Sequence, residues 1–214
     1  MYNRYMVFII FISIISILVA MIVHEFSHGF FAYLLGDETA KREGRLTLNP
    51  IAHLDPYISI ILPILCVFSN LPVIGGAKPV PVDSRELKWG KWGMALVALA
   101  GPLSNFIMAL ISFTMMHALN LSHGDIAAIF GRFTLINLSL AIFNLIPIPP
   151  LDGSRVAYAL APDFIRELYE KLEKGMGIFF VLIMVYVFGN SLSVFTSNIM
   201  MAILKIFYLI VGIK

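Results

Sequence analysis

The order of apolar and polar residues along the chain predicts a bundle of membrane helices. Residues 5–35, 93–119 and 126–147 are long apolar runs, and a helix needs about 20 such residues to cross a bilayer. Two shorter apolar runs, 176–189 and 194–213, predict a hydrophobic hairpin at the end of the sequence. We therefore expect an all-α polytopic membrane protein with about five transmembrane helices, in a single domain covering residues 1–214.

Two further stretches predict structure of another kind. Residues 57–68 are apolar, but the run is short and Pro63 lies inside it, so a re-entrant segment shielded from lipid by protein fits it better than a full span. Residues 45–48 alternate in hydropathy as a strand does, and the prolines in 77–82 favour an extended chain. We expect these last two stretches to form a small β-hairpin region near the cytoplasmic side.

Composition supports the membrane interpretation and excludes several alternatives. Hydrophobic residues make up 59% of the chain and charged residues only 13%, about half the usual share in a globular domain, so lipid must be the solvent for much of it. The single cysteine, Cys66, excludes an internal disulfide. A net charge of +2 without a polybasic run excludes nucleic acid as a partner.

The positions of the basic residues predict an orientation. Lysine and arginine gather in residues 36–50, 71–91 and 148–174, whereas the connections at 120–125 and 190–193 contain neither. The positive-inside rule then places the three basic regions in the cytoplasm. This arrangement requires 57–68 to return to the side from which it entered.

Candidate chemistry lies inside the first apolar run, in the pattern His24-Glu25-Phe26-Ser27-His28. On a helix, residues four apart share a face, so both imidazoles can reach one metal ion. Glu25 lies about 100° around the helix, close enough to reach a water at that metal. A third ligand should be acidic, and Asp152 is the only other acidic residue set among apolar segments.

Histidines on one helix face are often ordinary core or surface residues. Here three polar residues stand together in an apolar helix, and burying them without a partner costs several kcal/mol, so we favour a metal site. The other histidines lie in or near connections, and a structural role is favoured for each of them: His53, His117 and His123.

Several motifs together resemble the site-2 protease family of intramembrane zinc metalloproteases. They are His24-Glu25-Phe26-Ser27-His28, Gly101-Pro102-Leu103-Ser104-Asn105, Asn144-Leu145-Ile146-Pro147 and Leu151-Asp152-Gly153. The stretches 45–50, 53–56 and 77–82 further resemble the compact prokaryotic branch, which has neither a PDZ nor a CBS domain. The resemblance implies that His24, His28 and Asp152 bind one zinc ion per chain and that Glu25 is the general base.

The resemblance also places Asn144 near the zinc. Its amide would either donate to the developing oxyanion or form a hydrogen bond between helices in the membrane, and both roles stay open.

The expected function is that of an intramembrane zinc endopeptidase, which hydrolyses peptide bonds in or near transmembrane segments of other membrane proteins. Its partners would be these substrates and the lipid bilayer, in a prokaryotic cytoplasmic membrane with the active site toward the cytoplasm. The extended stretches 45–48 and 77–82 would either bind an unwound substrate segment by strand addition or form a structural hairpin that only covers the cytoplasmic mouth of the site. The alternatives are a metal-binding transporter or sensor and a catalytically silent scaffold. The sequence does not specify the oligomeric state.

Overall fold

The computed structural model of the chain describes residues 2–61, 65, 68 and 76–212. These residues form an all-helical structure, with no β-strand among them. The long helices are α1 (Tyr2–Leu34), α5 (Lys91–Ala118), α6 (Asp125–Asn144) and α8 (Asp163–Val211). Shorter helices in the described connections are α2 (Thr39–Arg42), α3 (Pro50–His53), the π-helix η1 (Pro56–Ile61) and α7 (Asp152–Leu160).

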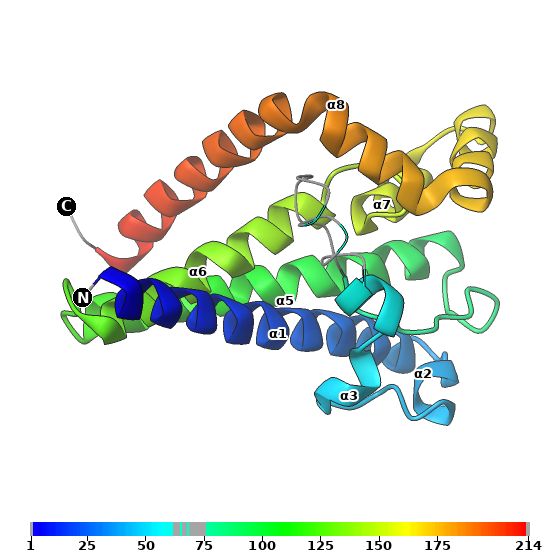
Figure 1. Cartoon of the computed structure of the whole chain (residues 1–214). Helices are drawn as coiled ribbons and strands as arrows, with labels where there is room; N and C mark the ends of the chain where they lie inside the picture. The colour runs from blue at the N-terminus through cyan, green and yellow to red at the C-terminus, as the bar shows by residue number, and fades with distance from the viewer. Residues whose placement is uncertain (1, 62–64, 66–67, 69–75, 213–214) are drawn as a thin grey trace.

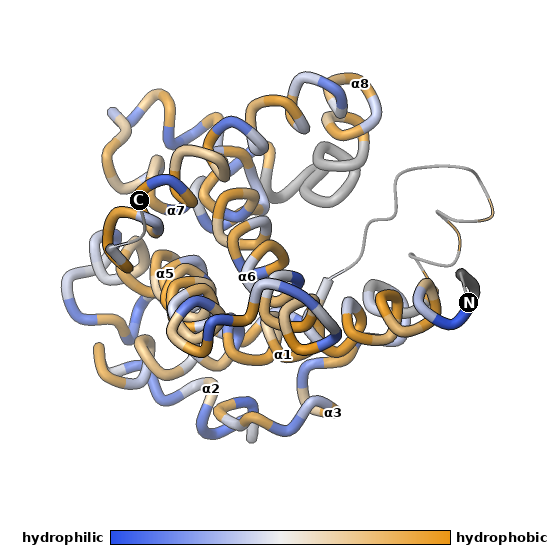
Figure 2. The backbone as a smooth tube through the Cα atoms, turned by 90° about the vertical axis from the view of Figure 1, so that its left-hand side faces the viewer, coloured by the Kyte–Doolittle hydropathy of each residue, from blue (hydrophilic) through white to orange (hydrophobic). Residues whose placement is uncertain are grey.

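Each long helix contains a stretch that is long and apolar enough to cross a membrane. Within the described part of the chain these candidate spans are Arg4–Leu34, Lys91–Ala118, Asp125–Asn144 and Ile183–Val211. Both chain ends and the connection between α5 and α6 lie at one end of the bundle, whereas α2 and α7 lie toward the other end (Figure 1). Polar residues are frequent in α2, while the long helices are mostly hydrophobic (Figure 2). The protein is therefore a multi-pass membrane protein.

The predicted hairpin of 176–189 and 194–213 is wrong, because α8 runs without interruption from Asp163 to Val211. The expected turn at 190–193 has the sequence Asn-Ser-Leu-Ser, which contains no proline. A helix tolerates such polar residues at a cost below about 1 kcal/mol each. Helix α8 bends along its length instead of turning back (Figure 1). The region predicted as a hairpin contains one candidate span. The described residues therefore contain four candidate spans, whereas the sequence predicted about five.

The small β-hairpin region is not confirmed. Residues 46–47 form a bend, and residues 76–83 have no regular secondary structure and pair with no strand in the described structure. The proposed re-entrant segment 57–68 lies partly outside the described residues, so it stays a prediction. Its described beginning is the π-helix η1.

Helix α5 occupies the centre of the bundle and packs against α1, α6 and α7. Toward the end that holds the termini, its Ala109 and Phe113 form a core with Leu138 and Ile142 of α6 and Phe207 of α8. Toward the other end, small buried residues of α5, including Gly101, face α1. Small residues allow membrane helices to approach closely, and this close approach brings α5 against the histidines of α1.

Candidate metal centre

Three of the predicted site residues meet in the structure, two from α1 and one from the first turn of α7. His24 Nε2 and His28 Nε2 lie 3.1 Å from each other, and Asp152 Oδ2 lies 3.1 Å from the first and 3.3 Å from the second. Both histidines are buried, with 7% and 8% of their residue surfaces exposed. Residues far apart in the sequence thus present three potential ligand atoms at one point.

The protonation of His24 follows from its neighbour on α5. His24 Nδ1 lies 2.7 Å from Asn105 Oδ1. Asn105 gives its own amide protons to the Ala20 carbonyl and to Asn137 Oδ1, at 3.0 and 2.9 Å. Because a backbone carbonyl can only accept, the amide of Asn105 is oriented with its oxygen toward His24. His24 therefore donates from Nδ1, and in the neutral imidazole the ring lone pair is on Nε2.

His28 is oriented in the same way by a backbone group. Its Nδ1 lies 2.7 Å from the carbonyl oxygen of Val97 on α5, which can only accept a hydrogen bond. His28 therefore donates from Nδ1, and in the neutral imidazole its Nε2 also presents a lone pair. A second hydrogen bond that fixes the tautomer of each imidazole is typical of histidines that ligate a metal.

With both imidazoles in this neutral tautomer, three lone-pair atoms converge at one point. Asp152 Oδ2 is buried and has no hydrogen-bond partner, which is costly unless a cation compensates for it. Tetrahedral zinc with ligands at about 2.0–2.1 Å separates those ligands by about 3.3 Å, close to the observed distances of 3.1–3.3 Å. Two imidazole nitrogens and one carboxylate oxygen are also ligands that zinc accepts. The residues present fit a zinc ion.

Two glycines make this convergence sterically possible. A Cβ atom on Gly101 of α5 would collide with His28 Nε2 and approach His24 Cε1 to 2.7 Å. A Cβ atom on Gly153, next to Asp152, would collide with the Leu145 carbonyl. Glycine at position 101 therefore lets α5 approach the two histidines closely, and glycine at position 153 lets the start of α7 pack against the backbone that follows α6.

Glu25 lies beside the three ligand atoms and is oriented by a distant part of the chain. Its Oε2 accepts a hydrogen bond of 3.0 Å from the backbone N–H of Val80. A cavity of about 290 Å³ is lined by all of the histidine and acidic residues of the site, and also by Asn144 and Arg155. The carboxylate of Glu25 thus borders a space next to the ligands in which a water and a peptide group can meet.

Asn144 lies at the last residue of α6 and lines the same cavity. Its Nδ2 donates to the carbonyl of Leu140 in its own helix at 3.0 Å. This hydrogen bond is therefore within one helix and not between helices. An amide nitrogen carries two protons, so one N–H remains for another acceptor.

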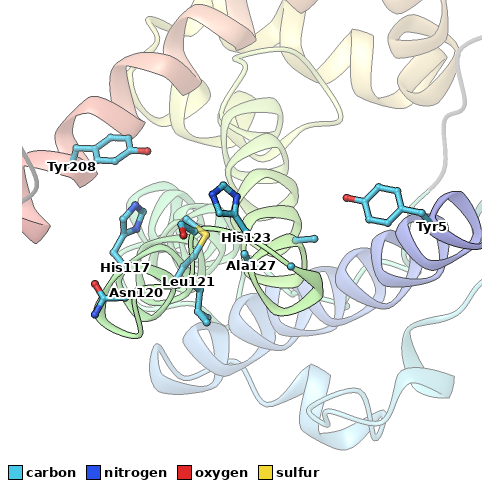
Figure 3. A pocket seen from close by; sticks show the side chains of 11 residues that line it. Tyr5, His117, Asn120, Leu121, His123, Ala127 and Tyr208 are labelled. Carbon is cyan, nitrogen blue, oxygen red and sulfur yellow. The ribbon is translucent and has the colours of Figure 1, made fainter. Parts of the chain in front are cut away.

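The other histidines lie elsewhere. His53 is buried and its Nε2 lies 2.7 Å from the Thr47 carbonyl. His117 and His123 line a larger cavity of about 840 Å³ at the end of the bundle that holds the termini (Figure 3). Among the described residues, His24, His28 and Asp152 form the only group of three or more histidine, cysteine or acidic side chains close enough to share a metal ion.

Sequence reasoning missed the residues that orient the site. Asn105 lies within a motif noted above, but its contact with His24 depends on how α5 packs on α1. Asn137 is a second fully buried amide in an apolar helix, and such a residue signals a polar contact in the membrane. Asp37 and Arg45 lie in a polar connection that suggested exposure, yet both are buried.

Comparison with known proteins assigns the family. A model described as peptidase family M50 matches residues 115–188. The Bacillus subtilis protein named "Putative zinc metalloprotease YwhC" is 37% identical over 185 residues, 83% of this chain and 81% of that protein. "Putative zinc metalloprotease Rip2" of Mycolicibacterium smegmatis is 28% identical over 169 residues, 78% of this chain and 64% of the relative. No solved structure matches the chain. Together with the geometry above, these similarities show that the chain belongs to the site-2 protease family, peptidase family M50.

Proposed function

We propose that the protein is an intramembrane zinc endopeptidase that hydrolyses peptide bonds in or near transmembrane segments of other membrane proteins. The observation that carries this proposal is the convergence of three potential ligand atoms beside Glu25, between helices apolar enough to cross a membrane. Relatives named as zinc metalloproteases support the same conclusion.

In this proposal, His24, His28 and Asp152 hold one zinc ion per chain. Zinc, when bound, acts as a Lewis acid that polarises a carbonyl and makes water more acidic. The Nδ1–H bonds to Asn105 and Val97 keep both imidazoles in the tautomer that presents Nε2.

Glu25 is the proposed general base and acid. Its carboxylate accepts a proton from the attacking water and then gives that proton to the nitrogen of the leaving amine. The N–H of Val80 holds the Oε2 atom of Glu25, so the Oε1 atom can face the cavity. Asn144 is a candidate donor to the oxyanion, because it lines this cavity and has a second amide proton.

The proposed location is a cell membrane with the site toward the cytoplasm. The basic connections predicted to be cytoplasmic join the ends of the helices that carry the site residues. His28 is six residues before the end of α1 at Leu34, about 9 Å along the axis. A short water path from that side to the site is therefore expected.

The test is cleavage of single-span membrane proteins by purified protein in liposomes. Glu25→Gln is nearly isosteric but cannot accept the proton, so cleavage should fall by about 10²–10⁴-fold while zinc content stays the same. Glu38→Gln, at an exposed glutamate, is the matched control and should cleave like the wild type. Fragments are identified by mass spectrometry. Wild-type rates in the Glu25→Gln protein would refute the proposal.

A further inference from the structure

The stretch 78–83 contacts Glu25 through one backbone N–H that lies between two prolines. Its sequence is Lys78-Pro79-Val80-Pro81-Val82-Asp83, and proline has no N–H. Val80 is therefore the only residue of its Pro-Val-Pro triplet that can donate a backbone hydrogen bond, and it donates to Glu25. The two prolines also restrict the backbone on both sides of this donor.

A buried arginine holds the N-terminal half of this stretch. Arg45 is 7% exposed, and its Nη2 donates to the carbonyls of Lys78 and Pro79, at 2.7 and 3.3 Å. The Lys78 N–H in turn donates to the His53 carbonyl at 2.8 Å. Burying a guanidinium group is costly unless it is hydrogen-bonded; Nη2 of this group bonds to the two carbonyls that precede Val80, whereas its buried Nε has no partner.

A buried aspartate holds the C-terminal half. Asp37 is completely buried, and its Oδ2 accepts from the Asp83 N–H at 2.7 Å. The side chain of Asp83 has a different partner: its carboxylate accepts hydrogen bonds from the guanidinium of Arg85, and these lower the pKa of the carboxyl to about 2. Val80 thus lies between two anchored points of the backbone.

These contacts change the interpretation of the stretch. Two carbonyls and two N–H groups of residues 78–80 already have partners within the chain. This part of the stretch is therefore not a free strand edge for a substrate. Its geometry is that of a support for the carboxylate of Glu25.

We propose that Arg45 is a positioning residue for the proposed general base. It fixes the backbone of Lys78 and Pro79, and this backbone directs the Val80 N–H at Glu25. Arg45 itself does not line the catalytic cavity, so it acts only through this backbone. The expected effect of Arg45 on kcat rests on the proposed function. Its expected effect on the Val80 backbone does not depend on any substrate.

The structural test is residue-resolved hydrogen–deuterium exchange at the Val80 amide. Arg45→Met should speed this exchange at least tenfold. Arg45→Lys keeps the charge and a donor, so it should give an intermediate rate and it provides a second variant if Arg45→Met folds poorly. Arg42→Met is the matched control, since Arg42 forms an exposed ion pair with Glu86. The Val80 amide of this variant should exchange at the wild-type rate. Unchanged Val80 exchange in both Arg45 variants would overturn the proposal.

The kinetic test is a double-mutant cycle with Glu25→Asp. Arg45→Met should lower kcat by about 10–100-fold in the wild-type background, as expected for a misplaced catalytic group. In the Glu25→Asp background, where the carboxylate is already displaced, the same change should cost less than twofold. Equal losses in both backgrounds would mean a general structural role and would overturn the positioning role. If the wild type cleaves nothing, the proposed function fails, and the exchange experiment still decides the role of Arg45.

Discussion

The two ends of the bundle each contain a cavity with two histidines, and only one of them has the geometry of a metal site. The larger cavity, about 840 Å³, contains His117 and His123 (Figure 3). The smaller, about 290 Å³, contains His24 and His28. Neither the volume of a cavity nor its number of histidines therefore identifies the site.

The difference lies in what surrounds each imidazole. His117, like His28, has its Nδ1 next to a backbone carbonyl, that of Phe113 at 2.8 Å. Its ring then packs against Phe113 and Tyr208, with centroids 4.2 and 5.3 Å away. His28 instead meets a second imidazole and a carboxylate. In both cavities the Nδ1 atom of a histidine lies next to a backbone carbonyl. Among the described residues, only the smaller cavity brings several potential ligand atoms to one point.

The largest expected effect comes from adding one methyl group where the helices touch. Gly101→Ala places a Cβ against His28 and His24, so zinc content should fall below about a tenth of the wild-type value and cleavage should be lost. Gly131→Ala on α6 is the matched control, because nothing lies within 4 Å of its added Cβ. It should keep zinc and raise the free energy of unfolding by about 0.5–1 kcal/mol. Full zinc content in Gly101→Ala would show that the packing of α5 does not define the site.

A smaller effect is expected from the residue that orients His24. Asn105→Leu removes the acceptor for Nδ1–H and leaves Ala20 and Asn137 without their partner. Zinc affinity should fall by about 10–100-fold, the usual loss when a partner of a ligating histidine is removed. Competition with a chelator measures this affinity. Asn190→Leu, at an exposed position of α8, is the control, and an equal loss in both variants would contradict the role of Asn105.

The smallest effect is expected at the opposite end. Replacing both His117 and His123 by alanine should leave the zinc content per chain within error of the wild type, because no acidic ligand joins them in the described structure. Loss of the ring contacts of His117 should lower the melting temperature only slightly. A fall of zinc content in this variant, measured by elemental analysis, would mean that the comparison of the two ends is wrong.

Much of the fold follows from the apolar runs alone. The predicted runs 5–35, 93–119 and 126–147 correspond to α1, α5 and α6, which begin and end within three residues of them. Such runs are clear because lipid requires about 20 apolar residues in succession. The end of the chain was predicted less well, since a few polar residues look like a turn although a helix can include them.

The candidate site follows from the sequence in part. The spacing of His24 and His28 places both imidazoles on one helix face, and the position of Asp152 in an apolar context points to it as an acidic partner. The roles of these residues and of Glu25 stay predictions until they are measured. Arg45 and Asp37 could not be predicted, because a polar residue in a connection is usually exposed. Their burial depends on contacts with residues 78–83, about 33 to 46 positions away.

The most direct test of the account is the zinc site itself. Elemental analysis and zinc X-ray absorption of the purified protein should give about one zinc per chain, bound by two imidazole nitrogens and at least one carboxylate oxygen. Asp152→Ala should lose most of this zinc, because it removes one of three protein ligands. Full zinc occupancy in Asp152→Ala, or a spectrum without histidine ligands, would contradict the central claim that His24, His28 and Asp152 together hold the metal.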